Sequence, residues 1–341
     1  GHASFANAMA MELAGVTADT PDPDGGEIIR DEAGQPTGIF VETASGLVGA
    51  AYGASRDSMT TEDLQAESMR ALLLAQEEAF SKGVTSFQDA GVGIETLEMY
   101  RKAIDDGDLK LRVWAMVSAS LPNLAEVLPA VRVVDYADNR LTVRAIKAYS
   151  DGALGSRGAW LLDPYDDDPG NTGHNTVPLE DIEAVVRLAL QHDYQVGTHA
   201  IGDRANQAVL DIYTVAFADM PDAAEDVRFR IEHSQIVDPM DVPRFADLGV
   251  VAAMQGIHAI SDGPWTPDRL GEQRTLNRAF QFRGFIDAGV TVMNGTDAPV
   301  EDVNPIPSYY GTVVGKMNNG EVLNPDQLMT RMEGLEAYTI N

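Results

Sequence analysis

Two histidines and one aspartate stand where apolar runs of the sequence end, and these residue types are ligands for divalent cations. His199, His233 and Asp297 each close an apolar run that is typical of a buried strand. Neutral imidazoles and carboxylates that converge on one point can hold such a cation. A single histidine at a strand end is more often a structural residue, and Asp297 alone could cap the turn before Pro299. The repetition of the pattern at three strand ends favours a metal site.

Lys147 is a fourth candidate ligand, because it lies inside the apolar run 143–150. A charged ammonium in the interior of a sheet needs a partner or a chemical modification to be tolerated. A lysine that has added carbon dioxide becomes an anionic carbamate, which removes the positive charge and can bridge two metal ions. The alternative is that Lys147 points outward or pairs with Asp151.

Four further residues are candidates for substrate binding. His258 and Asp262 follow the apolar run 250–255, where they either orient a substrate or stabilise the loop. Arg157 lies near the start of a long irregular segment. His2 would contact a ligand if the N-terminal segment folds over the site, and the alternative is that His2 is an artefact of a shortened start.

A scaffold that brings these residues together is indicated by the alternation of strand and helix patterns. Repeated units of this kind predict an α/β fold with a parallel sheet covered by helices, and this many in series favours a (β/α)8 barrel of the TIM type. Barrel enzymes carry their chemistry at the carboxyl ends of the strands. The predicted strands are 84–89, 111–119, 141–150, 194–199, 227–233, 250–255 and 290–296. The predicted helices are 60–83, 95–106, 122–133, 178–192, 204–218, 240–248 and 274–288.

The predicted organisation is one barrel domain, residues 60–341, preceded by a segment, residues 1–59, that packs on or over the barrel. Seven barrel strands are visible, and before residue 84 the one candidate for an eighth is the short run 37–41. Residues 3–15 are predicted to be helical. The irregular insertion at about 153–177 is longer than ordinary connections, so it is either a lid or a disordered excursion. Its position after a strand, at the catalytic end, favours the lid.

Composition excludes several classes of partner and site. The chain of 341 residues has 24 Lys and Arg against 53 Asp and Glu, a net charge of −29, which would repel nucleic acid and anionic lipid. It has no cysteine, so thiolate metal sites and thiol nucleophiles are excluded. No segment approaches the ~20 apolar residues of a membrane span. We expect a small-molecule substrate, and both the compartment and a homo-oligomer stay open.

Four segments carry a family resemblance that spans essentially the whole chain. They are Ile146-Lys-Ala-Tyr-Ser-Asp-Gly-Ala-Leu-Gly-Ser-Arg157, Gly197-Thr-His-Ala-Ile-Gly-Asp203, Arg230-Ile-Glu-His-Ser-Gln235 and Gly295-Thr-Asp-Ala-Pro-Val300. Together they resemble the metal-dependent amidohydrolase superfamily. More narrowly, the chain is similar to the YtcJ-like group of the amidohydrolase-3 type, which includes N-substituted formamide deformylases.

The resemblance implies a ligand set and its order. In that family a His-x-His pair lies on the first strand, a carboxylated lysine on the fourth, histidines on the fifth and sixth, and an aspartate on the eighth. The matching residues here are Lys147, His199, His233 and Asp297. No His-x-His pair occurs in this sequence. We therefore expect a missing first strand, a chain truncated at both ends, and a site for one metal ion in place of two.

The activity implied by the resemblance is hydrolysis of a C–N bond, in an amide, N-acyl or N-formyl substrate, by a metal-activated water. The expected cofactor is a divalent metal, zinc first, as one or two ions. Such an ion lowers the pKa of bound water toward ~7. Asp297 would act as the catalytic base and return the proton to the departing amine. Two alternatives stay open: a lactonase or phosphoesterase on the same scaffold, and a truncated, inactive remnant that lacks the His-x-His ligands.

Overall fold

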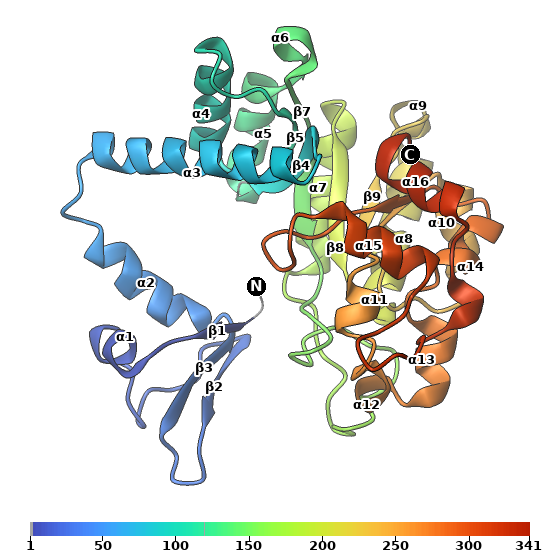
Figure 1. Cartoon of the computed structure of the whole chain (residues 1–341), viewed down its shortest axis with the longest axis horizontal. Coiled ribbons are helices and arrows are strands. Elements are labelled where there is room, and N and C mark those ends of the chain that lie inside the picture. Colours follow the sequence, from blue (N-terminus) through green and yellow to red (C-terminus); the bar gives the residue numbers. More distant parts are fainter. Residues whose placement is uncertain (1–2, 119) are drawn as a thin grey trace. The chain divides into compact units, whose positions relative to one another are not determined.

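The computed structural model describes residues 3–118 and 120–341, and the chain divides into two compact units, Gly1–Ala71 and Leu72–Asn341 (Figure 1). The boundary between them falls inside the long helix α3, Thr61–Ser81. The packing of the first segment on the barrel stays a prediction. Among the described residues, no helix is both long enough and apolar enough to cross a membrane.

The first unit is a small antiparallel sheet with two helices. Its strands pair in the order β1-β3-β2. Its core is formed by Ala6, Val16, Ile28, Phe40 and Ala44. The elements are β1 (Ala3–Phe5), α1 (Ala8–Leu13), β2 (Gly26–Arg30), β3 (Pro36–Glu42) and α2 (Ser45–Ser55).

The second unit contains a curled sheet of seven parallel strands, in the order β11-β10-β9-β8-β7-β5-β4. A short eighth strand, β6 (Val133–Asp135), pairs antiparallel with β7 outside this series. The strands are β4 (Ser86–Val92), β5 (Arg112–Val117), β7 (Leu141–Tyr149), β8 (Gln195–Ala200), β9 (Arg230–His233), β10 (Val251–Met254) and β11 (Val292–Asn294). Within the described residues β4 and β11 are the two edges and do not pair with each other.

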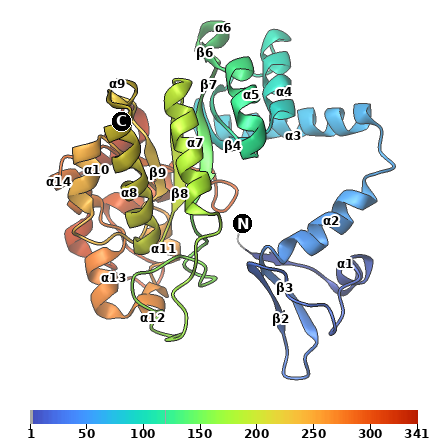
Figure 2. The ribbon, with the colours of Figure 1, turned by 180° about the vertical axis from the view of Figure 1, so that it is seen from behind.

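Helices cover the outer face of this sheet. Figure 2 shows α7 and α8 side by side, and α7 packs on β7 and β8. Its buried face, Ile182, Val186, Ala189 and Leu190, recurs at helical spacing, as burial against a sheet requires. The other helices are α4 (Ile94–Asp105), α5 (Leu121–Val131), α6 (Tyr136–Asn139), α7 (Leu179–Gln191), α8 (Asp203–Asp219), α9 (Pro221–Ala224), α10 (Val242–Leu248), α11 (His258–Ser261), α12 (Thr266–Leu270), α13 (Glu272–Arg278), α14 (Phe282–Asp287), α15 (Pro305–Val313), the 3-10 turn η1 (Pro325–Gln327) and α16 (Arg331–Thr339).

The seven predicted parallel strands are confirmed, and three element predictions were wrong. Within the predicted helix 3–15, the first described residues form a strand, because Ala3–Phe5 pair with β3, and the helix begins only after Asn7, whose side chain accepts a hydrogen bond from the Ala10 amide. The run 37–41 does not supply a barrel strand, since it lies in the separate antiparallel sheet. Helix 274–288 is broken between α13 and α14, where Phe280 takes a left-handed φ of 51° and its amide bonds to the Gln235 carbonyl.

The insertion between β7 and α7 contains no helix or multi-residue strand, as predicted, but it is tied to its surroundings. Its Asp166 amide donates to the Arg269 carbonyl at 2.8 Å, and the Arg274 guanidinium donates to the carbonyls of Asp163 and Pro164 at 3.0 and 2.7 Å. Tyr165 is buried within it. These contacts order the segment along α12 and α13, and its role as a lid stays a prediction.

Candidate metal centre

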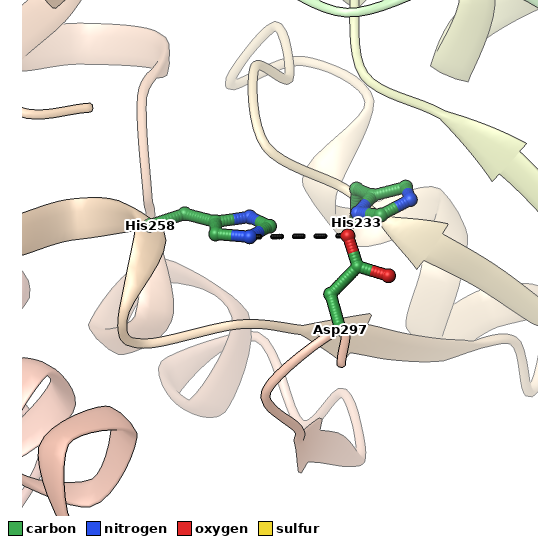
Figure 3. A group of neighbouring side chains, drawn as sticks. All are labelled: His233, His258 and Asp297. Carbon is green, nitrogen blue, oxygen red and sulfur yellow. Dashed lines mark ion pairs between the residues drawn. The ribbon is translucent and has the colours of Figure 1, made fainter. Parts of the chain in front are cut away.

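Three of the candidate residues form one compact cluster. His233, His258 and Asp297 each offer a ligand atom, and these atoms all lie within 4.8 Å of one another (Figure 3). His258 Nε2 lies 3.9 Å from Asp297 Oδ2. The residues come from the end of β9, the start of α11 and the loop after β11. The cluster therefore unites three separate strand ends of the curled sheet.

Left-handed backbone at two of these strand ends turns the chain toward the cluster. His233 has a φ of 78° and Ser234 a φ of 42°, and Asp297 has a φ of 57°. Residues other than glycine rarely adopt such angles, which cost free energy and are concentrated at functional sites. A strand that continued with extended angles would alternate its side chains between the two faces. Glu232 lies on the inner face, so a regular strand would place His233 on the outer face. The positive angles change the direction of the chain at His233.

A hydrogen bond sets the tautomer of His233. Its Nδ1 lies 2.8 Å from Oε1 of Gln255, and Nε2 of the same amide donates to the Ala253 carbonyl at 3.1 Å. Since that second bond makes Oε1 the acceptor, Nδ1 of His233 carries the proton. This leaves Nε2 as the ligating nitrogen, the arrangement typical of metal-binding histidines whose other nitrogen is held by a neighbour.

His258 is buried and neutral at physiological pH. Its side chain is 10% exposed, and burial lowers its pKa to about 4. Within residues 3–118 and 120–341 its Nε2 makes no hydrogen bond, although it is almost inaccessible to solvent. A buried nitrogen that lacks a donor, next to a carboxylate, is the arrangement that a cation would complete.

His199 stands beside this cluster and is positioned by Asp151. Its ring packs edge-on against His233, with centroids 4.5 Å apart, and its Nε2 lies 3.6 Å from Oδ1 of Asp151. Asp151 is fully buried and accepts hydrogen bonds from the backbone amides of Trp160, Ile201 and Gly202 at 2.8–3.0 Å. Through these three hydrogen bonds Asp151 connects the end of β8 to the insertion.

Lys147 and Tyr149 extend the same face along β7. Alternate residues of a strand share a face, and the Lys147 ammonium lies 4.8 Å from the centre of the Tyr149 ring. Burial lowers the pKa of Lys147, and the carboxylates of Glu232 and Asp297 act in the opposite direction. A lysine that spends more time neutral is the form that can react with carbon dioxide. The alternative, in which Lys147 points outward or pairs with Asp151, stays a prediction.

A buried ion pair closes the interior beneath the cluster. Nε of Arg230 donates to Oε1 of Glu232 at 2.8 Å, and the side chains are only 6% and 11% exposed. The guanidinium also bonds to Gln88 on β4, lies 4.5 Å from the centre of the Trp114 ring, and reaches Met293 Sδ on β11 at 3.9 Å. Arg230 thus contacts both edge strands of the sheet from β9.

The predicted substrate-binding residues fall into different places. Asp262 accepts a hydrogen bond from Gln235 at 3.1 Å, and burial raises its pKa to about 6, with the nearby Glu301 carboxylate acting in the same direction. Arg157 is paired with Asp167 within the insertion, at 2.9 Å. His2 lies outside the described residues.

The structure therefore joins His258 to the predicted ligands His233 and Asp297, with His199 and Lys147 beside them, while Arg157 is engaged elsewhere. The sequence analysis assigned His258 to substrate binding and not to the metal, since it follows its strand by four residues, and it did not single out Tyr149. The signal for Tyr149 was its two-residue spacing from Lys147. The donor set, two neutral imidazoles and a carboxylate, fits a divalent cation such as zinc.

A curled parallel sheet with histidine and aspartate donors at its strand ends is a scaffold of the amidohydrolase class, and comparison with known proteins agrees. The family model described as "Amidohydrolase family" matches residues 1–341. The chain belongs to this family.

Particular relatives place it more narrowly. It is 30% identical to "Putative amidohydrolase YtcJ" of Bacillus subtilis (strain 168), over 99% of this chain and 62% of that protein. It is 28% identical to the N-substituted formamide deformylase of Arthrobacter pascens, over 100% of this chain and 62% of that protein. An uncharacterized metal-dependent hydrolase from Pyrococcus furiosus superposes with a TM-score of 0.74 at 26% identity, over 99% of this chain and 64% of that one. The chain thus spans less than two thirds of the length of these proteins.

Proposed function

We propose that this chain forms the greater part of a zinc-dependent hydrolase that cleaves the C–N bond of an N-acyl or N-formyl amine. The observation that carries the proposal is the convergence of His233, His258 and Asp297 within 4.8 Å, next to His199. Family membership supports hydrolysis, and the name of the deformylase relative supports the bond class. The name of the Pyrococcus neighbour supports dependence on a metal.

His233 and His258 would hold the cation through their Nε2 atoms, with Asp297 as the carboxylate ligand and His199 at its flank. Zinc, when bound in such a site, lowers the pKa of a coordinated water toward ~7 and polarises a carbonyl oxygen. In the carboxylated form, Lys147 would supply a further anionic ligand. The site would hold one ion if His199 and Lys147 bind the same ion as the cluster, and two ions if they bind a separate one.

Asp297 would move the proton. Its side chain is 35% exposed, so it reaches solvent while it contacts His258. A carboxylate in this position accepts a proton from the attacking water and then delivers it to the nitrogen of the departing amine. The amine must be protonated as it leaves, because an amide anion is a very poor leaving group.

The curled sheet would belong to an eight-stranded barrel. Strands β4 and β11 are its two edges, and Arg230 contacts residues of both. One more parallel strand between these edges would complete the barrel that amidohydrolase-type enzymes use. The strand would also cover two open edges that otherwise expose backbone donors and acceptors.

The test is a hydrolysis assay of the purified chain, stripped of metal and then loaded with zinc. The substrates are N-benzylformamide, N-benzylacetamide, a γ-lactone and phenyl phosphate. We expect zinc-dependent release of benzylamine, abolished by Asp297→Asn and kept by Asp222→Asn, a matched change of an exposed aspartate on α9. Turnover of only the lactone or the phosphate ester would replace the proposed bond class by the alternative hydrolases. No turnover of any substrate by a zinc-loaded, folded chain would favour the inactive remnant.

A further inference from the structure

Tyr149 occupies the mouth of the site between two of the candidate ligands. It is the last residue of β7, in register with His199 on β8. Its ring centre lies 4.8 Å from the Lys147 ammonium and 5.8 Å from the centre of the His199 ring. The aromatic ring therefore lies close to two of the candidate ligands.

The hydroxyl of Tyr149 lies beside strand β4. It lies 3.7 Å from the position that a Cβ atom would take on Gly91, a residue of β4 on the far side of β5. Lys147 Cγ lies 3.5 Å from the same position, so the hydroxyl and the lysine stem share this corner. Gly91 has a φ of 128°, which glycine adopts without strain, and its bare backbone lines the corner.

This hydroxyl is unused by the protein. Tyr149 forms no hydrogen bond within the described part of the chain, and the residue is 43% exposed. The buried tyrosines of the same unit differ: Tyr165 and Tyr194 donate to backbone carbonyls at 2.8 Å, and Tyr213 bonds to the Thr198 hydroxyl at 2.7 Å. Unlike these three hydroxyls, the Tyr149 hydroxyl is available to a bound ligand.

We propose that Tyr149 is a catalytic residue whose hydroxyl donates a hydrogen bond to the carbonyl oxygen of the substrate as negative charge develops there. This inference rests on the proposed metal-dependent hydrolysis. The tyrosine stays protonated throughout and forms no covalent bond; its role is to oppose the charge that appears when water adds to the carbonyl carbon. A donor aimed at the charge of the transition state stabilises that state more than the planar substrate.

The test compares Tyr149→Phe with Tyr310→Phe in the zinc-loaded chain. Tyr310 is the matched control, because it is 37% exposed, lies on α15 and has no part in the site. Isothermal titration calorimetry measures two probes beside the planar amide N-benzylacetamide. Acetohydroxamate binds the metal of hydrolases of any bond class, and N-benzyl methylphosphonamidate mimics the tetrahedral state of N-benzylacetamide. Zinc content and circular dichroism establish that both variants are loaded and folded.

We expect Tyr149→Phe to weaken the phosphonamidate by about 100-fold or more, the usual cost of removing one such donor, while Tyr310→Phe changes nothing. Binding of the planar N-benzylacetamide should change less than about twofold, which separates stabilisation of charge from loss of packing. A third result is also informative: the unaltered chain does not bind the phosphonamidate, and Tyr149→Phe loses affinity for acetohydroxamate. This result would support the role of the Tyr149 hydroxyl and would contradict the proposed cleavage of a C–N bond. Equal affinity of the unaltered chain and Tyr149→Phe for both probes would overturn the inference, as would an unaltered chain that binds neither.

Discussion

Arg230 and Glu232 form an ion pair, 2.8 Å long, inside the curled sheet, one residue before the metal-centre histidine His233. Both side chains are buried, and burying a charged group costs free energy unless the group is well paired. The cation is further satisfied by the Gln88 amide oxygen and the face of Trp114. The pair therefore sets the position of β9 with respect to strands β4 and β5.

The first prediction concerns this pair. Arg230→Met should destabilise the folded chain by about 3–5 kcal/mol, because it leaves the Glu232 carboxylate buried without its partner. The double variant Arg230→Met with Glu232→Gln should recover most of that loss, since no charge is then buried. Urea unfolding of the three proteins measures this. A single variant that costs less than about 1 kcal/mol would show that water reaches Glu232.

The second prediction concerns the metal. His258→Ala and His233→Ala should each lower zinc affinity by more than the 10–100-fold that loss of an outer-shell partner causes. His174→Ala, which alters an exposed histidine of the insertion, should have no effect. Competition with a chromophoric chelator gives the affinities. If His258→Ala binds zinc as tightly as the unaltered chain, His258 contacts substrate in place of metal.

The third prediction concerns Asp151. An asparagine there keeps one acceptor oxygen but turns an amide group toward backbone N–H donors, so Asp151→Asn should cost about 2–4 kcal/mol. Amide hydrogen exchange should accelerate at Trp160, Ile201 and Gly202. The control Asp163→Asn alters an exposed ion pair and should cost under about 1 kcal/mol. Unchanged exchange at Trp160 would show that other contacts hold the insertion.

The fourth prediction is a pH dependence of stability. The folded pKa of Asp262 is raised to about 6 from its ordinary value near 3.8, chiefly by burial. A raised carboxyl pKa means that stability is fully present below about pH 4 and is lost as pH rises through about 6. Asp262→Asn should thus be more stable than the unaltered chain at pH 7.5, by about 1–3 kcal/mol, and equal to it at pH 4.

A carboxyl group with the opposite shift provides the comparison for this fourth prediction. Arg283 lowers the pKa of Glu333 to about 2, so its stabilisation is present above about pH 4.5 and is lost as pH falls toward 2. Glu333→Gln should therefore be less stable at pH 7.5 and approach the unaltered chain in acid. The same slope of stability with pH for both variants would contradict the burial of Asp262.

The strand series could be read from the sequence because each buried parallel strand is a continuous apolar run, followed by a polar residue at the site. Lys147, His199, His233 and Asp297 were located this way, and the structure gathers them at one end of the sheet. Features that depend on long-range contacts could not be predicted from the sequence. The run 37–41 has the pattern of any strand, and its pairing with β1 and β2 is a tertiary choice that local pattern does not encode.

The remaining misses have the same physical origin. Helix 274–288 has good helical periodicity, but the hydrogen bond of the Phe280 amide to Gln235 outweighs one turn of helix. The place of His258 depends on how the loop after β10 turns into α11, and no spacing rule predicts that turn. Arg157 is drawn to Asp167 only because the insertion folds back on itself.

Asp151 also bears on how this family can be remodelled. Its carboxylate accepts hydrogen bonds from the amide of Trp160 in the insertion and from the amides of Ile201 and Gly202 in the turn after β8. Because the insertion and the scaffold of the site bind the same carboxylate, the insertion cannot be exchanged as an independent module. An insertion grafted from a relative would have to present a backbone amide at the place of Trp160. Without that amide, Asp151 would no longer connect the insertion to the turn after His199.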